Sequence, residues 1–420
     1  MKYLFFTNTP AQVHQYRRAV TTLRERGHDA LVLARDYGCT VALLDHYDVP
    51  YESYGRVGTD KFSLASELPK HAARIVLETR RFDPDCVFGR GSFAALAGTV
   101  ARAPVVLVDD SETTDLDHAV AVPLADAVLT PHTFEKDLGE SHYEFRGFKE
   151  CAYLHPDEYQ RQSDIRDELG VGPDEEFAIV RLNAFGSHHD VGQAGFTPAK
   201  RRELIERLAE RATVFVSDEG GELDTEETPA RPFDLHPALL HDALAEASLL
   251  VADTQTMVTE AALLGTPAIR SNSFVGDDDM GNFVALERAG LVYNLKEFDA
   301  VLDAATDILS DETAAERWRT LREEYLDDKV NLTEVVVEVA ERAASSGGLD
   351  ARSLDRVAGL DSRSADRDAD RALPFGAVRS DGGEETRSRH ETPPRRAARD
   401  ERARDRDGAR DRDRTEGNRR

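Results

Sequence analysis

The sequence predicts an α/β fold with two doubly wound, Rossmann-like domains followed by a disordered C-terminal tail. Three observations predict it. Short apolar segments alternate with helical segments near the N-terminus, the same alternation returns in the second half, and the composition changes abruptly near Ser346. Repeated strand, helix and strand units of this length build a parallel sheet with helices on both faces. The expected boundaries are a first domain at 1–146, a connector at 147–162, a second domain at 163–345 and a tail at 346–420.

In the first half, each expected strand is a short run of apolar residues bounded by turn formers. These strands are Tyr3–Thr7, Ala30–Ala34, Pro50–Tyr54, Cys86–Gly89, Val105–Val108, Ala127–Thr130 and Tyr143–Phe145. Helical patterns run between them, for example at Val13–Arg26, which Gly27 closes, and at Leu64–Arg81.

The second half repeats this plan and ends in helices. We expect strands at Phe177–Leu182, Thr213–Ser217, Ser248–Ala252 and Pro267–Arg270. Helices are expected at Pro198–Arg211, Pro237–Ala247, Met257–Leu264, Glu297–Leu309, Thr313–Asp327 and Leu332–Ser345. From about Ser346 the chain is rich in Arg, Asp, Ser, Gly and Pro, and so little apolar surface does not offset the entropy of ordering.

The chain is strongly acidic, and its charge is unevenly distributed. The formal net charge is −27, but residues 351–420 hold 19 Arg and 16 Asp or Glu, so the rest of the chain is near −30. Lys is scarce, with eight residues against 45 Arg. This composition predicts a halophile's salt-rich cytoplasm, because high ionic strength screens the self-repulsion. It argues against a nucleic-acid partner, since no Lys/Arg-rich face precedes the tail.

Cysteine usage and hydropathy indicate the compartment. Cys39, Cys86 and Cys151 are far apart and form no CxxC pair, which favours reduced structural thiols. Met1–Thr7 already has a strand pattern, and no apolar run approaches membrane-spanning length. We expect a soluble cytoplasmic protein, and peripheral contact with a membrane surface stays open.

The most informative stretch is Leu250–Arg270, where a buried strand turns into a helix. The apolar run breaks at residues 253–256, and Thr254 or Thr256 is placed to cap the helix that follows. Free backbone N–H groups and the positive end of the helix dipole make such a cap an anion site suited to a diphosphate. Glu260, one turn deeper, is suited to accept hydrogen bonds from ribose hydroxyls.

Eight short segments spread along the chain form a recognisable set. They are Thr7–His14, Arg26–His28, Ala34–Gly38, Leu124–Pro131, Phe148–Pro156, Arg181–Ala184, Ser271–Ser273 and Asp279–Phe283. Together they resemble the domain-of-unknown-function family 354, over roughly residues 1–340. The resemblance implies the GT-B architecture, which many glycosyltransferases share with the UDP-N-acetylglucosamine 2-epimerases. It leaves the activity open.

The resemblance extends in part to the nucleotide motif of the 2-epimerases. Where those enzymes carry Asp-Ser-Gly-Gly and then Gln-Glu-Glu-Ala, this chain has Asp253-Thr254-Gln255-Thr256 and then Val258-Thr259-Glu260-Ala261. Thr254 matches the phosphate-binding hydroxyl, and Glu260 matches the ribose-binding acid. Gln255 and Thr256 replace two glycines, and their side chains narrow the anion site.

Polar residues follow three strands of the first half, at the edge where open parallel sheets bind ligands. Asn8 and Thr9 follow the first strand, in a loop that lacks the G-x-G-x-x-G pattern of a dinucleotide site. His14 is expected either to act as a base toward an acceptor hydroxyl or to be a plain helix-cap histidine. Arg90 either clamps an acidic group of a ligand or forms a salt bridge across the domain cleft. Asp110 is a candidate general base or part of a solvated acidic rim.

The acids of the first half match the epimerase pattern only partly. An acid that the epimerases carry after the fourth strand falls near Arg90 in this chain. Asp109, Asp110 and Glu112 match the neighbourhood of another of their acids. Epimerisation is therefore the second interpretation, behind glycosyl transfer.

Polar residues of the second half are expected at the facing edge. Arg181 and Asn183 follow its first strand, where the guanidinium either neutralises a departing diphosphate or pairs with an acidic neighbour. Asn272 and Asn282 are expected to line the same edge and to bind the hydroxyls of a sugar.

The pattern as a whole predicts a nucleotide-sugar-dependent, glycosyltransferase-like protein of surface glycan or glycoconjugate synthesis. His14 or Asp110 would activate the hydroxyl of a glycan or lipid-linked acceptor, while Arg181 stabilises the departing diphosphate. No cofactor and no metal are expected, because Ser187–Asp190 and Asp277–Asp279 are weak metal patterns. A UDP-N-acetylglucosamine 2-epimerase-like enzyme and a non-catalytic GT-B-fold binding protein stay open as alternatives. The oligomeric state is not indicated.

Overall fold

The expected alternation of strands and helices is confirmed by a computed structural model. It describes residues 1–56, 61–112, 114–182, 195–221, 223, 227–273, 275–276, 279–346, 349 and 351–363. The chain divides into the units Met1–Ala372 and Leu373–Arg420, and all the described residues belong to the first.

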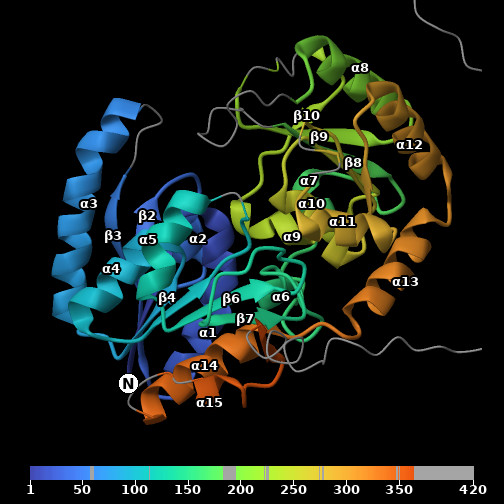
Figure 1. Cartoon of the computed structure of the whole chain (residues 1–420). Helices are drawn as coiled ribbons and strands as arrows, with labels where there is room; N and C mark the ends of the chain where they lie inside the picture. The colour runs from blue at the N-terminus through green and yellow to red at the C-terminus, as the bar shows by residue number, and fades with distance from the viewer. Residues whose placement is uncertain are drawn as a thin grey trace, which may run out of the picture. The chain divides into compact units, whose positions relative to one another are not determined.

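The first domain is built on a sheet with the strand order β14-β7-β6-β5-β4-β1-β2-β3 in the described part of the chain. Figure 1 labels five of these strands, β2, β3, β4, β6 and β7. The strands are β1 (Lys2–Thr7), β2 (Asp29–Asp36), β3 (Tyr51–Arg56), β4 (Cys86–Gly89), β5 (Val105–Val108), β6 (Ala127–Pro131), β7 (His142–Phe145) and β14 (Leu360–Ser362). Neighbouring strands pair in parallel except β14, which is antiparallel to β7. The central strands β4, β5 and β6 are buried throughout, as expected where helices cover both faces.

Helices of the first domain follow the strands in turn. They are α1 (Pro10–Glu25), α2 (Thr40–His46), α3 (Lys61–Phe82), α4 (Gly91–Ala101), α5 (Asp115–Ala121), the 3₁₀ turn η1 (Val122–Leu124) and α6 (Cys151–Leu154). Pro10 starts α1, where its fixed φ suits a helix and its missing N–H costs no hydrogen bond. Val13, Tyr16, Val20 and Leu23 are all buried, so one stripe of α1 packs on the sheet.

The second domain has a six-stranded sheet in the described residues, with the order β10-β9-β8-β11-β12-β13 and only parallel pairs. Its strands are β8 (Phe177–Leu182), β9 (Thr213–Asp218), β10 (Arg231–Pro232), β11 (Leu249–Ala252), β12 (Ala268–Arg270) and β13 (Val292–Asn294). Its helices are α7 (Ile165–Leu169), α8 (Pro198–Ala209), the 3₁₀ turn η4 (Pro237–Leu239), α9 (Leu240–Glu246), α10 (Thr256–Leu264), α11 (Gly281–Arg288), α12 (Phe298–Ser310) and α13 (Ala314–Leu326).

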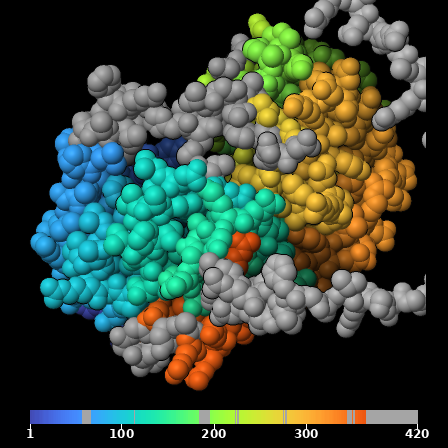
Figure 2. Space-filling view, in the orientation of Figure 1, coloured from blue at the N-terminus to red at the C-terminus, as the bar shows by residue number. Residues whose placement is uncertain are grey.

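The chain then returns to the first domain. Helix α14 (Leu332–Ser346) packs against α1 and α6, although the sequence pattern had grouped it with the second domain. Figures 1 and 2 show this orange part of the chain beside the blue and cyan first domain. The physical reason is that its stripe Leu332, Val336, Val339 and Ala340 is fully buried there.

The beginning of the expected tail is ordered, which corrects the boundary at Ser346. Residues Ala351–Leu354 form α15, and β14 extends the first sheet beyond β7. Leu354, Val357 and Leu360 are buried, so this short stretch supplies the apolar surface that the average composition of the tail conceals.

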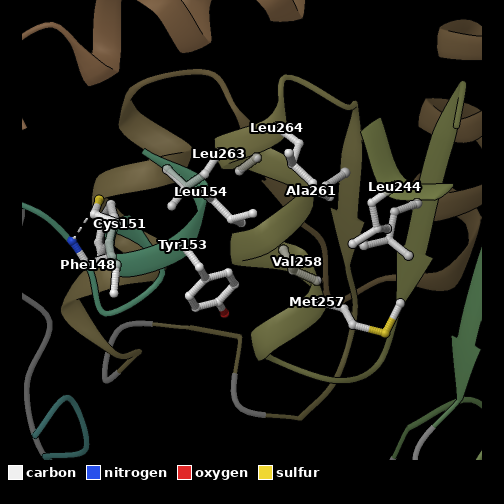
Figure 3. Packing of buried hydrophobic residues seen from close by; sticks show 14 of the residues in the cluster. Phe148, Cys151, Tyr153, Leu154, Leu244, Met257, Val258, Ala261, Leu263 and Leu264 are labelled. Carbon is white, nitrogen blue, oxygen red and sulfur yellow. Dashed lines mark hydrogen bonds between the residues drawn. The ribbon is translucent and has the colours of Figure 1, made fainter. Parts of the chain in front are cut away.

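The two domains share one hydrophobic cluster, in which α6 packs against α10. Figure 3 shows Tyr153 and Leu154 of α6 facing Val258 and Leu263 of α10. The α6–α10 contact places the connector beside the helix that follows β11.

Among the described residues, no helix combines the length and apolarity that crossing a membrane requires.

Candidate functional site

The carboxyl ends of β4 and β5 place Arg90 and Asp109 side by side. Arg90 Nε lies 3.0 Å from Asp109 Oδ1, and the other oxygen of this carboxylate lies 3.0 Å from His118 Nε2. Asp109 Oδ1 also accepts a hydrogen bond from the Ser111 N–H. The salt bridge of Arg90 is therefore made within the first domain, and the expectation of one across the cleft is wrong.

Asp110 and Glu150 share one lysine. Lys149 Nζ contacts the Asp110 carboxylate and lies 3.0 Å from Glu150 Oε1. Burial favours the neutral form of Asp110, but the positive charges of Lys149 and then Arg90 outweigh it and lower the pKa of this carboxyl. Burial raises the pKa of Glu150, and Lys149 opposes this while Asp110 and Glu260 add to it. The pKa values of the two carboxyl groups are therefore shifted in opposite directions.

Glu150 and Lys149 were not selected from the sequence, although both lie in one of the segments that carry the family resemblance. The signal was a charged pair directly before α6, at the start of the connector. Its meaning depends on Asp110, which is 39 positions away from Lys149 in the chain. That distance in sequence is why the pattern alone did not reveal the pair.

A small cavity, here called the cleft pocket, lies between the two domains. Its lining from the first domain is Asp110, Glu112, Pro131, Thr133, Phe134, Phe148, Lys149 and Glu150, and its lining from the second is Met280, Gly281 and Asn282. A Cβ on Gly281 would lie 2.0 Å from the Thr133 carbonyl oxygen, so only glycine allows this close approach of α11. The cavity measures about 10 Å³, roughly the space of one water molecule. The domains are therefore closed on each other here.

The predicted residues of the first loop have other partners. The Asn8 N–H donates to Gln12 Oε1 at 2.6 Å, and Tyr54 Oη donates to Asn8 Oδ1 at 2.6 Å. Thr9 is the N-cap residue of α1, but its side chain makes no capping hydrogen bond within the described residues. None of these side chains lines the cleft pocket.

His14 lies inside the domain interface, together with Glu260. We call His14, Tyr153, His241 and Glu260 the sealed cluster, because each is buried. Glu260 is 3% exposed, and its Oε1 accepts a hydrogen bond from Tyr153 Oη at 2.8 Å and lies 3.1 Å from His241 Nε2. The rings of His14 and His241 are 4.5 Å apart. The alternative that His14 is a helix cap is wrong, since Thr9 holds that position.

The sealed cluster fills the recess that the sequence predicts for a ribose. Tyr153 and His241 both contact Glu260 Oε1, so a ribose hydroxyl that bound this oxygen would compete with them. Burial, followed by His241 and Arg17, holds the pKa of His14 well below its usual value. His14 is therefore a neutral imidazole at neutral pH.

Arg181 ends β8, next to the end of β11 in the register of the sheet. Its Nη1 donates to Ser217 Oγ at 2.5 Å, and its Nη2 forms an ion pair with Glu219. Burial lowers the pKa of Arg181, and Asp253, Cys39 and Glu260 oppose this shift. Arg181 and Glu260 thus lie on the same side of the predicted nucleotide site, close enough to interact electrostatically.

The start of α10 differs from the expectation. Gln255 is the N-cap residue, with no capping hydrogen bond from its side chain, so the prediction that Thr254 or Thr256 caps the helix is wrong. The physical reason is that α10 already begins at Thr256, with the Val258 N–H bonded to the Gln255 carbonyl. Among the described residues the Thr254 hydroxyl is buried and has no hydrogen-bond partner.

The predicted asparagines lie at different places. Asn272 Nδ2 donates to the Asp253 carbonyl at 3.1 Å, which ties the loop after β12 to the end of β11. Asn282 lines the cleft pocket, and its Oδ1 is buried without a hydrogen-bond partner in the described residues. Asn183 lies outside the described residues, as do the histidines of Ser187–Asp190.

Acidic and histidine groups of the described residues form no cluster of three placed to hold a metal ion. Asp279, the described member of the acidic run, forms an ion pair with the fully buried Arg270. Asp277 and Asp278 lie outside the described residues.

Comparison of the sequence with known proteins identifies a family and a relative. A family model described as "Protein of unknown function (DUF354)" matches residues 2–341. The uncharacterized protein MJ0665 of Methanocaldococcus jannaschii is 24% identical over 276 residues, which cover 63% of this chain and 79% of MJ0665.

Solved structures share the fold at low sequence identity. The UDP-GlcNAc 2-epimerase of Neisseria meningitidis bound to UDP-GlcNAc superposes with a TM-score of 0.58 at 13% identity, covering 80% of this chain and 99% of that chain. The glycosyltransferase VinC in complex with dTDP superposes with a TM-score of 0.53 at 15% identity, covering 82% and 99%. The predicted GT-B fold is therefore confirmed, and at these identities the likeness shows the fold alone.

Proposed function

We propose that this chain, which belongs to the DUF354 family, is a nucleotide-sugar-dependent glycosyltransferase-like enzyme. One observation carries the proposal: polar groups of both domains line a single cleft pocket, beside the carboxyl end of β5. Asp110 and Lys149 come from the first domain, and Asn282 comes from the second. Open α/β sheets bind ligands at this edge, and paired domains allow donor and acceptor to approach from opposite sides.

The donor is proposed to bind at the ends of β8 and β11. Arg181 supplies a positive charge there, and the first turn of α10 supplies backbone amides and the positive end of a helix dipole. The buried Thr254 hydroxyl is available for a phosphate oxygen. Two proteins of the same fold were solved with UDP-GlcNAc and with dTDP, which supports a nucleotide-sugar as the ligand class.

Binding requires the domains to separate. A cavity of about 10 Å³ does not hold a sugar, and Tyr153 and His241 occupy Glu260. Opening would release Glu260 toward a ribose, and closing would exclude water from the reacting centre and so suppress hydrolysis.

The acceptor is proposed to enter from the first domain, as a glycan or a lipid-linked glycan. Asp110 and His14 remain the candidates from the sequence for the base that takes the proton of its hydroxyl. The acids Asp110, Glu112 and Glu150 line the pocket against one lysine. This excess of negative charge disfavours an acceptor that carries phosphate or carboxylate near the attacking hydroxyl.

A second candidate is epimerisation of a UDP-N-acetylamino sugar. The observation that favours it is the presence of several carboxyl groups, Asp110, Glu112 and Glu150, in one pocket. An epimerase converts its sugar nucleotide without an acceptor, whereas a transferase releases nucleoside diphosphate only when an acceptor is present. A binding protein without catalytic activity would do neither.

Calorimetric titration with UDP-, GDP- and dTDP-sugars at high salt, followed by product analysis with and without acceptors, tests the proposal. We expect one nucleotide class to bind and Arg181→Gln to lower turnover about 10²–10³-fold, because a donor to the developing charge is lost. Arg211→Gln is the matched control, since Arg211 also bonds a serine, Ser310, but at an exposed site. If no nucleotide-sugar binds to the wild type, the proposed function is wrong.

A further inference from the structure

We propose that Glu150 is the group that takes the proton from the acceptor hydroxyl, and that Lys149 and Asp110 position and tune it. The inference rests on the proposed function and gives its reaction a base that the sequence did not indicate. It is carried by the geometry of the cleft pocket, in which these three side chains meet.

Glu150 is both buried and part of the pocket lining. It is the residue directly before α6, and only 2% of it is exposed. Phe148, on the same turn, closes the pocket beside it and is itself buried in the shared hydrophobic cluster. A carboxyl group fixed at the wall of a small pocket is well placed to meet a hydroxyl that enters.

The charges around Glu150 do not balance. Lys149 supplies one positive charge to two carboxylates, and it contacts Asp110 more closely than Glu150. Arg90 adds a second positive charge in the field of Asp110, whereas Glu260 adds a negative charge in the field of Glu150. Glu112 brings a further acid to the lining. The less compensated carboxylate is the stronger base, because protonation relieves the excess negative charge.

The other two candidates are weaker bases in this structure. Lys149 and Arg90 lower the pKa of Asp110 despite its burial, so this carboxylate holds a proton poorly. His14 does not line the pocket, and burial lowers its pKa. Glu150 also lines the pocket, but the net shift of its pKa is upward, because burial outweighs the opposing charge of Lys149. A pair of acids whose environments shift their pKa values in opposite directions is typical of sites for acid–base catalysis.

The proposed step conserves atoms and electrons. The O–H bond of the acceptor breaks and its proton passes to a carboxylate oxygen of Glu150. The acceptor oxygen forms a bond to the anomeric carbon of the donor sugar, and the bond from that carbon to the diphosphate oxygen breaks. The electron pair of the broken bond leaves with the diphosphate, close to Arg181.

Glu150→Gln in the full chain tests the assignment, with nucleotide binding measured in parallel. The amide keeps the shape and loses the base, so we expect turnover to fall about 10²–10⁴-fold while nucleotide affinity is unchanged. Glu168→Gln, at an exposed position of α7, is the matched control and should match the wild type. If the wild type binds no nucleotide-sugar, the proposed function fails; if it turns over and Glu150→Gln does too, only the inference fails.

The pH profile of kcat/KM provides a second readout that a purely structural role would not change. We expect an acid limb above the ordinary glutamate value of about 4.3, because activity needs Glu150 ionised and its pKa is raised. Asp110→Asn frees Lys149 for Glu150 and removes a negative neighbour, so the limb should move to lower pH. If Glu150→Gln does not fold, the shift of the acid limb in Asp110→Asn tests the assignment by itself. An acid limb at the same pH as in the wild type contradicts the assignment.

Discussion

The cleft pocket and the sealed cluster both join the two domains, but they handle buried polar groups in different ways. The cleft pocket brings charged groups together around a cavity, with Lys149 between Asp110 and Glu150. The sealed cluster surrounds one carboxyl group, Glu260, with a tyrosine and a histidine, and none of its four members lines the cleft pocket. The first arrangement suits chemistry, and the second suits a contact that opens and closes.

The difference follows from what burial costs. An isolated carboxylate away from water is unfavourable unless it is paired or hydrogen-bonded. Tyr153 and His241 provide that partnership for Glu260 in the closed state. Under the proposed function a ribose would provide it in their place, so that nucleotide binding and the interface contact would compete for the same carboxyl oxygen. The pocket acids, by contrast, keep a surplus of charge, and their substitution should affect activity more than stability.

Tyr153→Phe is expected to have the largest effect on stability. It removes one of the donors to Glu260 and leaves a buried carboxyl group partly unsatisfied, so the free energy of unfolding should fall by about 1–3 kcal/mol. Tyr51→Phe is the control, because Tyr51 Oη bonds Asp45 at the exposed surface and should change stability by less than about 0.5 kcal/mol. If denaturant unfolding shows the same loss of free energy of unfolding in both variants, the distinction between a buried and an exposed hydrogen-bonded pair is wrong.

The pH dependence of stability sharpens the comparison. Because the pKa of His14 is lowered in the folded state, the unfolded chain binds more protons below the ordinary histidine value of about 6.5. Its contribution is therefore present above that pH and is lost as the pH falls, by at most about 1.4 kcal/mol per pH unit. His14→Gln should flatten the difference in unfolding free energy between pH 7 and pH 5. A slope as steep as that of the wild type would show that His14 is not the responsible group.

Thr254→Val should give the smallest change in stability. The hydroxyl of Thr254 is buried and has no hydrogen-bond partner in the described residues, so its replacement by a methyl group should leave unfolding within about 0.5 kcal/mol of the wild type. Nucleotide affinity should nevertheless fall several-fold if this hydroxyl binds a phosphate oxygen. A clear loss of stability without a change in affinity would indicate a purely structural role.

The sequence predicted many of the strands and helices well, because these elements depend on local patterns of residues. Strand Val105–Val108 is apolar throughout, and Phe177–Leu182 is apolar except for Arg181; the structure confirms both with the same bounds. Helix α11 was not predicted, because it is short and follows an acidic run. Residues 351–362 were assigned to the tail because three buried apolar residues, Leu354, Val357 and Leu360, carry little weight in a charged composition.

The candidate site was predictable only in outline. Strand ends identified Asp110 and Arg181, because parallel sheets place their functional residues there, and the helix after the strand Ser248–Ala252 identified Glu260. Partners were not predictable: Tyr153 lies 107 positions from Glu260, and Asp110 lies 39 positions from Lys149. Which carboxyl group is sealed and which faces a pocket depends on packing between segments that are distant in sequence.

The most direct test of the account is calorimetric titration of the wild type and Tyr153→Phe with UDP-, GDP- and dTDP-sugars at high salt. If the nucleotide and Tyr153 compete for Glu260, one class of sugar nucleotide binds both proteins and binds Tyr153→Phe several-fold more tightly. Absence of binding to either protein would contradict the proposed nucleotide site, and equal affinity would contradict the competition.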